Sequence, residues 1–383
     1  MFCGACMKRT ISEGFRSSGV VTSGSRHVAS MNVFNRNVKA LQRGRSVMDS
    51  NYESFQHLRN VVGGLLIDRV RDVKASHAKF ERALDIGSRF QKDSLLDLKE
   101  AGGVRQLHQM DISQRLLDYL DENDDGSSGV SVHRTFADEE DNPFCRESGK
   151  GELDLVISNL ALHWTNDLPT SLQQIRDSLR PDGMFVASIF GGSTLQELRD
   201  SFLVAEQERF GGVSIRVSPM AGVTDAGNLL TRSRFALTTV DMETVVVNYQ
   251  DMFQLMEDLR GMGESSAALH RGPPLARSTL FAAAAAYQGL YGNEDGTIPA
   301  TFQIIFMTGW HPAESQPKPL TRGSAQYSFK DMKSLDSEVE EDGFSLADLG
   351  EVHALPEENE LDGEDEKKGK ERQDELDDNN DKK

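Results

Sequence analysis

A short run, residues 83–88, most constrains what this chain can fold into. Residues 83–86 read as a buried strand, and Gly87 then allows a tight turn because a residue without a Cβ adopts positive φ at little cost. The stretch after the turn carries three leucines that suit an apolar helix face: Leu95, Leu96 and Leu98. Strand, glycine turn and helix form the first unit of a doubly wound α/β domain, in which ligands bind at the carboxyl ends of the strands.

Strand-like and helix-like stretches alternate along the rest of the chain. Further strands are expected at residues 104–110, 130–136, 153–158, 184–190, 236–241, 243–249 and 302–310, with a tight turn at Met242. Helices are expected at residues 55–70 (with Gly63 and Gly64 inside), 112–120 (with Ser113 as N-cap), 168–179, 194–210, 251–260 and 280–291. The alternation predicts βαβ units in a mainly parallel sheet, and right-handed crossovers place helices on both faces.

Acidic residues follow three strands that should end at one edge of this sheet. Asp85 closes the first strand, Asp111 closes the second and Asp138 follows the third. Asp111 lies 26 residues after Asp85, near the offset of about 20 residues at which a carboxylate accepts hydrogen bonds from ribose hydroxyls. One such acid is more often a loop residue or a helix cap, but three at one edge favour a nucleoside site. The turn itself departs from the dinucleotide fingerprint, because Arg89 and Gln91 stand where glycines are expected.

Composition excludes several classes of protein. The formal net charge is −19, and residues 336–383 supply −14 of it from 20 acidic and 6 basic residues. So acidic a chain is a poor candidate for nonspecific nucleic-acid binding, which needs Lys and Arg. Three cysteines cannot form a disulfide framework, no apolar run reaches the roughly 18 residues of a membrane span, and no H-x-D or H-E-x-x-H spacing indicates a metal site.

The two ends of the chain differ from its middle. Residues 1–30 are basic and rich in Ser and Thr, with Glu13 as their one acid, which is typical of a mitochondrial or plastid transit peptide; a disordered tail with a chance basic bias is the alternative. Residues 331–383 are acidic and low in aromatics, which predicts disorder. Residues 31–330 are expected to form one domain, with a core at about 75–192 and an elaboration at 193–330.

Several segments resemble the class I S-adenosylmethionine (SAM)-dependent methyltransferases, methyltransferase type 11 branch: residues 84–87 (LDIG), 110–113 (MDIS), 137–139 (ADE), 153–159 (LDLVISN) and 179–183 (LRPDG). Residues 159–169 and 190–199 are similar to two groups in it, the malonyl-acyl-carrier-protein O-methyltransferases and the family of the fifth assembly factor of mitochondrial complex I. Residues 31–34 (MNVF), 256–264 (MEDLRGMGE) and 300–304 (ATFQI) resemble the assembly-factor family, and the likeness covers about residues 31–330.

The resemblance implies a Rossmann-like methyltransferase fold with a mainly parallel seven-stranded sheet, helices on both faces and appended helices. It also implies a SAM-binding protein of the mitochondrial matrix, without a membrane span and peripheral to the inner membrane. Its partner would be a complex I subunit or assembly intermediate, on which it hydroxylates an arginine.

The resemblance also assigns roles to residues by position. The implied cofactor residues are Asp85, Gly87, Arg89, Asp111, Ile112, Asp138, Glu139, Asn159 and Leu162, and the implied substrate side is His163 and Trp164. Side chains at Arg89 and Gln91 would crowd the methionine moiety, although the Arg89 guanidinium could instead pair with its carboxylate. For His163 and Trp164, packing under the loop is the alternative.

Two other functions fit the same residues. One is a SAM-dependent O-methyltransferase that acts on a carboxylate, such as that of malonyl-acyl carrier protein. The other is an assembly scaffold that kept the fold and lost its cofactor chemistry. The altered turn at Arg89 and Gln91 is the feature that favours the scaffold, and binding of SAM is the observation that separates it from the two enzymes.

A reporter experiment tests the targeting hypothesis. Residues 1–30 fused to a fluorescent protein should direct it to mitochondria, because basic, acid-poor leaders are imported there. Microscopy that shows a diffuse cytosolic reporter, or import into plastids, would contradict this expectation.

Overall fold

The computed structural model describes residues 32–73, 80–88, 90–146, 150–270 and 272–317. The chain divides into two units, Met1–Gln316 and Pro317–Lys383, and its described helices and strands belong to the first. The expectations for residues 1–30, for Arg89 and for residues 331–383 lie outside the described residues.

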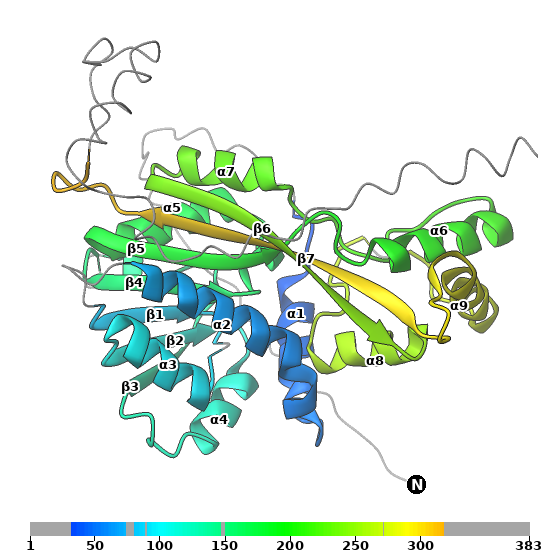
Figure 1. Cartoon of the computed structure of the whole chain (residues 1–383), viewed down its shortest axis with the longest axis horizontal. Coiled ribbons are helices and arrows are strands. Elements are labelled where there is room, and N and C mark those ends of the chain that lie inside the picture. Colours follow the sequence, from blue (N-terminus) through cyan, green and yellow to red (C-terminus); the bar gives the residue numbers. More distant parts are fainter. Residues whose placement is uncertain (1–31, 74–79, 89, 147–149, 271, 318–383) are drawn as a thin grey trace, which may run out of the picture. The chain divides into compact units, whose positions relative to one another are not determined.

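Seven strands form one sheet in the order β3-β2-β1-β4-β5-β7-β6 (Figure 1). They are β1 (Arg82–Ile86), β2 (Gln106–Asp111), β3 (Ser131–Phe136), β4 (Leu153–Asn159), β5 (Leu179–Phe190), β6 (Ala236–Tyr249) and β7 (Ile298–Trp310). The first five strands run parallel, and β7 runs antiparallel to both of its neighbours. The predicted mainly parallel seven-stranded sheet is thus confirmed, and the carboxyl ends of β1 to β4 share one edge.

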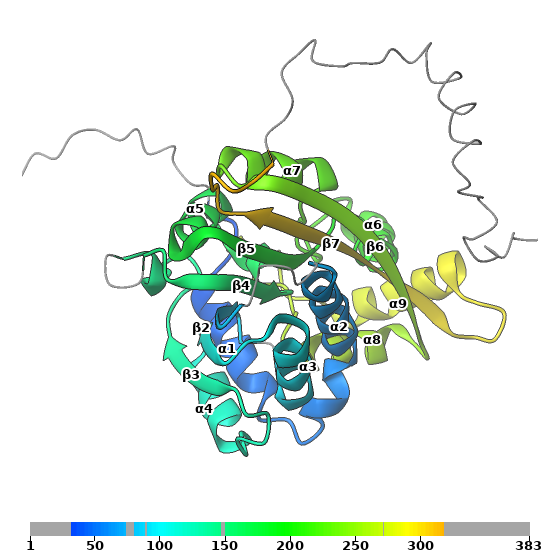
Figure 2. The ribbon, with the colours of Figure 1, turned by 60° about the vertical axis from the view of Figure 1, so that its left-hand side comes forward.

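Helices cover both faces of this sheet (Figures 1 and 2). They are α1 (Arg36–Ser46), α2 (His57–Asp72), α3 (Lys92–Gly102), α4 (Gln114–Glu122), α5 (Leu168–Ser178), α6 (Gln196–Phe210), α7 (Val223–Arg232), α8 (Met252–Gly261) and α9 (Arg277–Tyr291), with short 3₁₀ turns at Tyr52–Gln56, Pro143–Cys145 and Leu162–Trp164. Helices α6, α8 and α9 gather around one end of the long strands β6 and β7 (Figure 1).

The alternation of side chains along the strands builds two cores. Ala83 of β1 packs in a cluster with apolar residues of α2 and α3, whereas its neighbour Leu84 packs in a cluster with residues of α5 and α7. Successive residues of a strand point to opposite faces, so burying both faces requires near-continuous apolar strands. The sequence of β4, LDLVISN, is buried throughout for this reason.

The prediction of two strands at residues 236–241 and 243–249 is wrong. One strand, β6, runs through Met242, which pairs with Ile305 of β7. Asp241 and Glu243, on either side of Met242, lie two apart and share one face of the strand. Arg69 of α2 binds both carboxylates at 2.9 Å, so both acids fit within the strand.

Helix α2 continues through its two adjacent glycines. A Cβ on Gly63 would lie 3.1 Å from Nδ2 of Asn159 in β4, whereas a Cβ on Gly64 would meet no atom within 4 Å. Gly63 therefore allows α2 to approach the carboxyl end of β4 closely, and Gly64 does not serve this contact.

The two glycines provide a matched test of this packing. Gly64→Ala should raise the free energy of unfolding by about 1 kcal/mol, because alanine is the better helix former. Gly63→Ala has the same gain in helix propensity, but its methyl group meets Asn159, so its net effect should be smaller or negative. Chemical denaturation of both variants checks the order, and equal gains would show that α2 does not approach β4 this closely.

Candidate functional site

Two carboxylates at the ends of β2 and β3 lie side by side and bind the same arginine. Asp111 ends β2, and Glu139 follows β3, which pairs in parallel register with β2. Arg43 of α1 donates from Nη1 to Asp111 Oδ2 at 2.8 Å and also to Glu139 Oε1. All three side chains are fully buried. The predicted ribose and adenine acids therefore come together, around a cation that the sequence analysis did not anticipate.

Helix α1 carries three cations on the face that it turns toward the sheet. Asn35 caps the helix by accepting a hydrogen bond from the Val38 amide at 3.1 Å. The cations Arg36, Lys39 and Arg43 follow at intervals of three and four residues, which places them on one face of a helix. The N-terminal part of α1 is thus fixed by its cap, and the cations extend along the acidic edge.

Arg36 binds the outer acids of the same edge. It donates to Asp138 Oδ1 at 2.8 Å, to Glu139 and to the backbone oxygen of Trp164 at 3.0 Å. Glu139 is therefore held by two guanidinium groups. Asp138 is part-exposed and also accepts the Glu140 amide at 3.0 Å, so it shapes the loop after β3.

Lys39 binds a second buried carboxylate, Glu264, in the loop after α8. Its Nζ lies 3.1 Å from Glu264 Oε2 and donates to the Gly263 oxygen at 2.7 Å. Arg59 of α2 donates to Glu264 Oε1 at 2.5 Å, and Trp164 Nε1 donates to Oε2 at 2.6 Å. Lys39 also lies 3.4 Å from the centre of the Trp164 ring, a cation–π contact. Glu264 thus joins α1, α2 and the turn after β4.

His163 is the neutral member of this cluster. Its Nε2 lies 3.5 Å from Glu264 Oε2, and the side chain is buried. Burial lowers the pKa of His163 to about 4, although Glu264 favours its charged form. Burial also favours the neutral form of Glu264, but Lys39, His163 and Arg59 outweigh it and hold the Glu264 pKa well below its usual value. The cluster at neutral pH is therefore a carboxylate, two cations and an uncharged imidazole.

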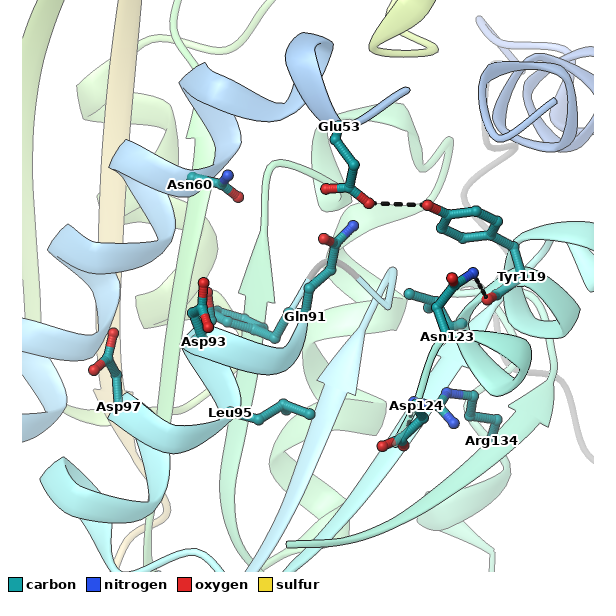
Figure 3. A pocket seen from close by; sticks show the side chains of 13 residues that line it. Glu53, Asn60, Gln91, Asp93, Leu95, Asp97, Tyr119, Asn123, Asp124 and Arg134 are labelled. Atoms are coloured by element: carbon teal, nitrogen blue, oxygen red, sulfur yellow. Dashed lines mark hydrogen bonds and ion pairs between the residues drawn. The ribbon is translucent and has the colours of Figure 1, made fainter. Parts of the chain in front are cut away.

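A buried side chain of β1 holds the glycine turn that follows this strand. Gly87 has φ of 96°, a left-handed conformation that favours glycine. Asp85 Oδ2 accepts the Phe90 amide at 3.2 Å and Gln109 Nε2 at 3.0 Å, so this acid holds the turn in shape. Gln91, with φ of −109° and ψ of −177°, is extended and needs no glycine for its backbone. Its side chain lines a separate cavity (Figure 3).

The remaining predicted residues lie at the end of β4. Asn159 donates from Nδ2 to the Arg59 oxygen at 2.9 Å and accepts from Ser188 Oγ at 3.2 Å. Ile112 follows Asp111 and is buried, and Leu162 packs in the core beneath α5. His163 and Trp164 are both buried, and Phe34 packs edge-on against Trp164 with ring centres 5.1 Å apart. Asn159 and Leu162 therefore support the edge, while Trp164 lies under α1.

The residue types at this edge suit a nucleoside cofactor, and α1 is what covers them. The carboxylate of Asp111 can accept ribose hydroxyls, and Gly87 permits close approach of a ligand to the backbone. In this structure, however, Asp111 Oδ1 accepts the Ser113 amide at 2.7 Å and Oδ2 accepts Arg43. Both oxygens of Asp111 are therefore bonded within the protein itself.

Two cavities adjoin the site without containing the acid pair. The cavity of about 450 Å³ in Figure 3 lies beside α3 and is lined by acids such as Asp93 and Asp97, with Tyr119 bonded to Glu53 at 2.9 Å. Neither Asp111 nor Glu139 lines it, so we do not place the cofactor there. A second cavity, of about 220 Å³, is lined mainly by apolar side chains and reaches Trp164 and Glu264. It lies where the resemblance puts the substrate.

The sequence alone did not indicate a role for five side chains at this edge: Arg36, Lys39, Arg43, Arg59 and Glu264. The spacing of the α1 cations was visible, but their partners lie far away in the chain. Within the part of the chain that the structure describes, no three His, Cys, Asp or Glu side chains are grouped to hold a metal ion. No described helix has both the length and the apolar character to cross a membrane.

The chain is similar to known proteins in sequence and in fold. A family model described as a methyltransferase domain matches residues 84–187. The mouse protein "Arginine-hydroxylase NDUFAF5, mitochondrial" is 43% identical over 320 residues, which cover 83% of this chain and 89% of that protein. A malonyl-[acyl-carrier protein] O-methyltransferase of Gallionella capsiferriformans is 28% identical, covering 74% of this chain and 94% of that protein. The crystal structure of YcgJ from Bacillus subtilis is similar at 13% identity and a TM-score of 0.45, covering 66% of this chain and 99% of that one. The resemblance stated from the motifs is confirmed.

The buried imidazole predicts a loss of stability in mild acid. Because the pKa of His163 is lowered in the folded state to about 4, from 6.5, the unfolded chain binds a proton that the folded chain excludes. The free energy of unfolding should therefore fall by about 2 kcal/mol between pH 7 and pH 5 from this residue.

Denaturation of wild type and His163→Asn at both pH values measures this contribution. The difference between pH 7 and pH 5 should be smaller in the variant, while His108, whose pKa burial also lowers, contributes to both proteins. Equal pH dependence in the two proteins would show that His163 is not held neutral. The range stays above pH 5 so that Glu264 remains ionised throughout.

Proposed function

This chain belongs to the family of the mitochondrial arginine-hydroxylase NDUFAF5, and we propose from that premise that it binds SAM and hydroxylates an arginine of a complex I subunit. The partner in this proposal is that subunit or an assembly intermediate that contains it. The place of action is the mitochondrial matrix, reached through a transit peptide in residues 1–30, with peripheral association at the inner membrane.

One observation carries the cofactor part of the proposal. Asp111 at the end of β2 and Glu139 in the loop after β3 lie close enough for a single guanidinium nitrogen to contact both. Two carboxylates at the ends of neighbouring parallel strands are suited to the hydroxyls and the amino group of a nucleoside. The relatives support the same assignment, since the family model spans β1 to β5 and therefore both strands.

The residues of the chain would act at this edge by binding and orientation. Asp111 would accept the ribose hydroxyls, Glu139 and Asp138 would lie beside the adenine, and Asp85 would keep the Gly87 turn open toward the methionine part. Bound SAM supplies an activated methyl group, which hydroxylation does not use. Hydroxylation with O₂ places one oxygen atom on the arginine and reduces the other to water with two electrons and two protons, so the reaction needs a reductant.

Two other functions are distinguished by their products. A 28% identical relative named as a malonyl-[acyl-carrier protein] O-methyltransferase motivates the first, in which a carboxylate receives the methyl group. The burial of Asp111 and Glu139 under α1 motivates the second, a scaffold that acts without the cofactor. Methyl ester formation on malonyl-acyl carrier protein identifies the first, and assembly without modification of any arginine identifies the second.

Rescue of cells that lack their own NDUFAF5 relative tests the proposal. The full chain should restore complex I and add one oxygen, +16 Da, to an arginine of one of its subunits, as read by peptide mass spectrometry. Asp111→Asn should lower that modification about tenfold or more, since a hydrogen bond to a charged group is worth about 1.5–3 kcal/mol and about 1.4 kcal/mol is a factor of ten.

A matched control separates loss of binding from a general effect of the substitution. Asp118→Asn, on the exposed side of α4, makes the same chemical change away from the site and should rescue fully. Restored complex I without any oxidised arginine would overturn the hydroxylase proposal and leave the scaffold. Full modification by Asp111→Asn would overturn the role of Asp111.

A further inference from the structure

The position of Arg43 sets a condition on any ligand that uses Asp111. Both side chains are fully buried, so solvent does not reach the carboxylate. One oxygen of Asp111 is bonded to its own loop through the Ser113 amide, and the other is bonded to Arg43. A ribose can therefore reach this carboxylate only if a group that now covers it moves, and Arg43 is the side chain bonded to the oxygen that does not hold its own loop.

We propose that Arg43 is an internal competitor of the cofactor, and that it sets the affinity of this site for SAM. The inference rests on the proposed binding of SAM at Asp111. In the closed state, which this structure has, Arg43 neutralises the acid pair; in the open state, ribose hydroxyls replace it at Asp111. The affinity measured on the whole population equals the affinity of the open state multiplied by the fraction of molecules that are open.

The way α1 is attached makes its C-terminal half the part that can move. Backbone hydrogen bonds join the segment before α1 to the loop after α8, from the Asn35 amide to the Ala267 oxygen and from the Leu269 amide to the Val33 oxygen, both 2.8 Å long. Asn166 also accepts the Val33 and Phe34 amides at 2.8 Å. The start of α1 is thus fixed by the main chain, whereas Arg43 near its end is held to the acidic edge by its side chain.

A cleft beside α1 leaves room into which the helix or a bound ligand can move. It has a volume of about 440 Å³ and lies between α1 and the loop after β2. Its lining is Ala40, Leu41, Gly44, Arg45, Ile112, Ser113, Gln114 and Arg115. A Cβ on Gly44 would lie 3.1 Å from the Ser113 hydroxyl, so the helix and the loop are in close contact at its floor. The cleft reaches Ile112, next to Asp111, and Arg43 separates it from the acid pair.

The same helix connects the cofactor edge to the cavity on the substrate side. Lys39 lies one turn before Arg43 and binds Glu264, which lines that cavity together with Trp164. Release of Arg43 removes one of the contacts that hold α1 against the cofactor edge and the cavity on the substrate side. Lys39 stands between the fixed start of α1 and Arg43, so a displacement of the C-terminal half should change the Lys39–Trp164 contact and couple the two subsites through one helix.

Calorimetry with SAM on the full chain tests the proposal. Arg43→Gln keeps a polar side chain, although a shorter one, and removes its charge, so it should tighten binding by about tenfold if about nine molecules in ten are closed. Arg209→Gln makes the same change at an exposed position in the last turn of α6, away from the site, and it should bind like wild type. A double variant adds a further check, because Asp111→Asn should weaken binding more in the Arg43→Gln background than alone.

The outcomes separate this inference from the proposed function. No binding by wild type or by Arg43→Gln would mean that the cofactor proposal itself fails. Binding by wild type that Arg43→Gln leaves unchanged or weakens would overturn the inference alone, because Arg43 would then be neutral toward the cofactor or a ligand of it.

A fluorescence measurement keeps the inference testable if Arg43→Gln does not fold. Trp164 lies against Lys39 of α1, and the other tryptophan is Trp310 of β7. In Trp310→Phe with Arg43 intact, SAM should change the Trp164 emission in proportion to the sites filled. Saturation by calorimetry with unchanged emission would contradict a release of α1.

Discussion

The fold of this protein brings three buried carboxylates, Asp111, Glu139 and Glu264, together beyond the carboxyl ends of the parallel strands, and the cations of α1 make their burial possible. An isolated buried carboxylate is costly, and several kcal/mol are lost when one partner of a buried ion pair is removed. Arg43 binds both Asp111 and Glu139, and Lys39 and Arg59 both bind Glu264. The described acids and cations therefore depend on one another, and the position of α1 follows from this dependence rather than from apolar packing alone.

This mutual dependence explains why the cluster can serve as a switch as well as a support. A buried ion pair contributes little net stability compared with an apolar contact of the same size, because desolvation offsets the attraction. A ligand can therefore replace Arg43 only if it supplies other polar partners to Asp111 while Glu139 stays paired with Arg36. The backbone pairing of residues 33–35 with residues 267–269 keeps the helix attached when that happens.

The sequence predicted most of the sheet and the acids at its edge, because those features are local. Gly87 after an apolar run, Ser113 as a helix cap and the alternation of strands and helices all act within a few residues, and the structure has them in place. The turn predicted at Met242 is wrong. The acids on either side of it, Asp241 and Glu243, are balanced within the strand by Arg69, which lies 172 and 174 positions away from them. The partners of the α1 cations were not predicted for the same reason: Arg43 lies 68 positions from Asp111, and Lys39 lies 225 positions from Glu264. A pattern in one segment cannot show which distant segment neutralises it.

The central claim, that α1 and the cofactor exclude one another at Asp111, is tested most directly by hydrogen exchange at the amides of α1. Without ligand, the amides of Arg36–Ser46 should be protected, since the helix is closed over the acid pair. With saturating SAM, exchange should accelerate in the C-terminal half of α1, around Arg43, while the paired segment at residues 33–35 keeps its protection. Unchanged or stronger protection around Arg43 in the presence of SAM would contradict the account, because Arg43 would then remain in place while the cofactor is bound.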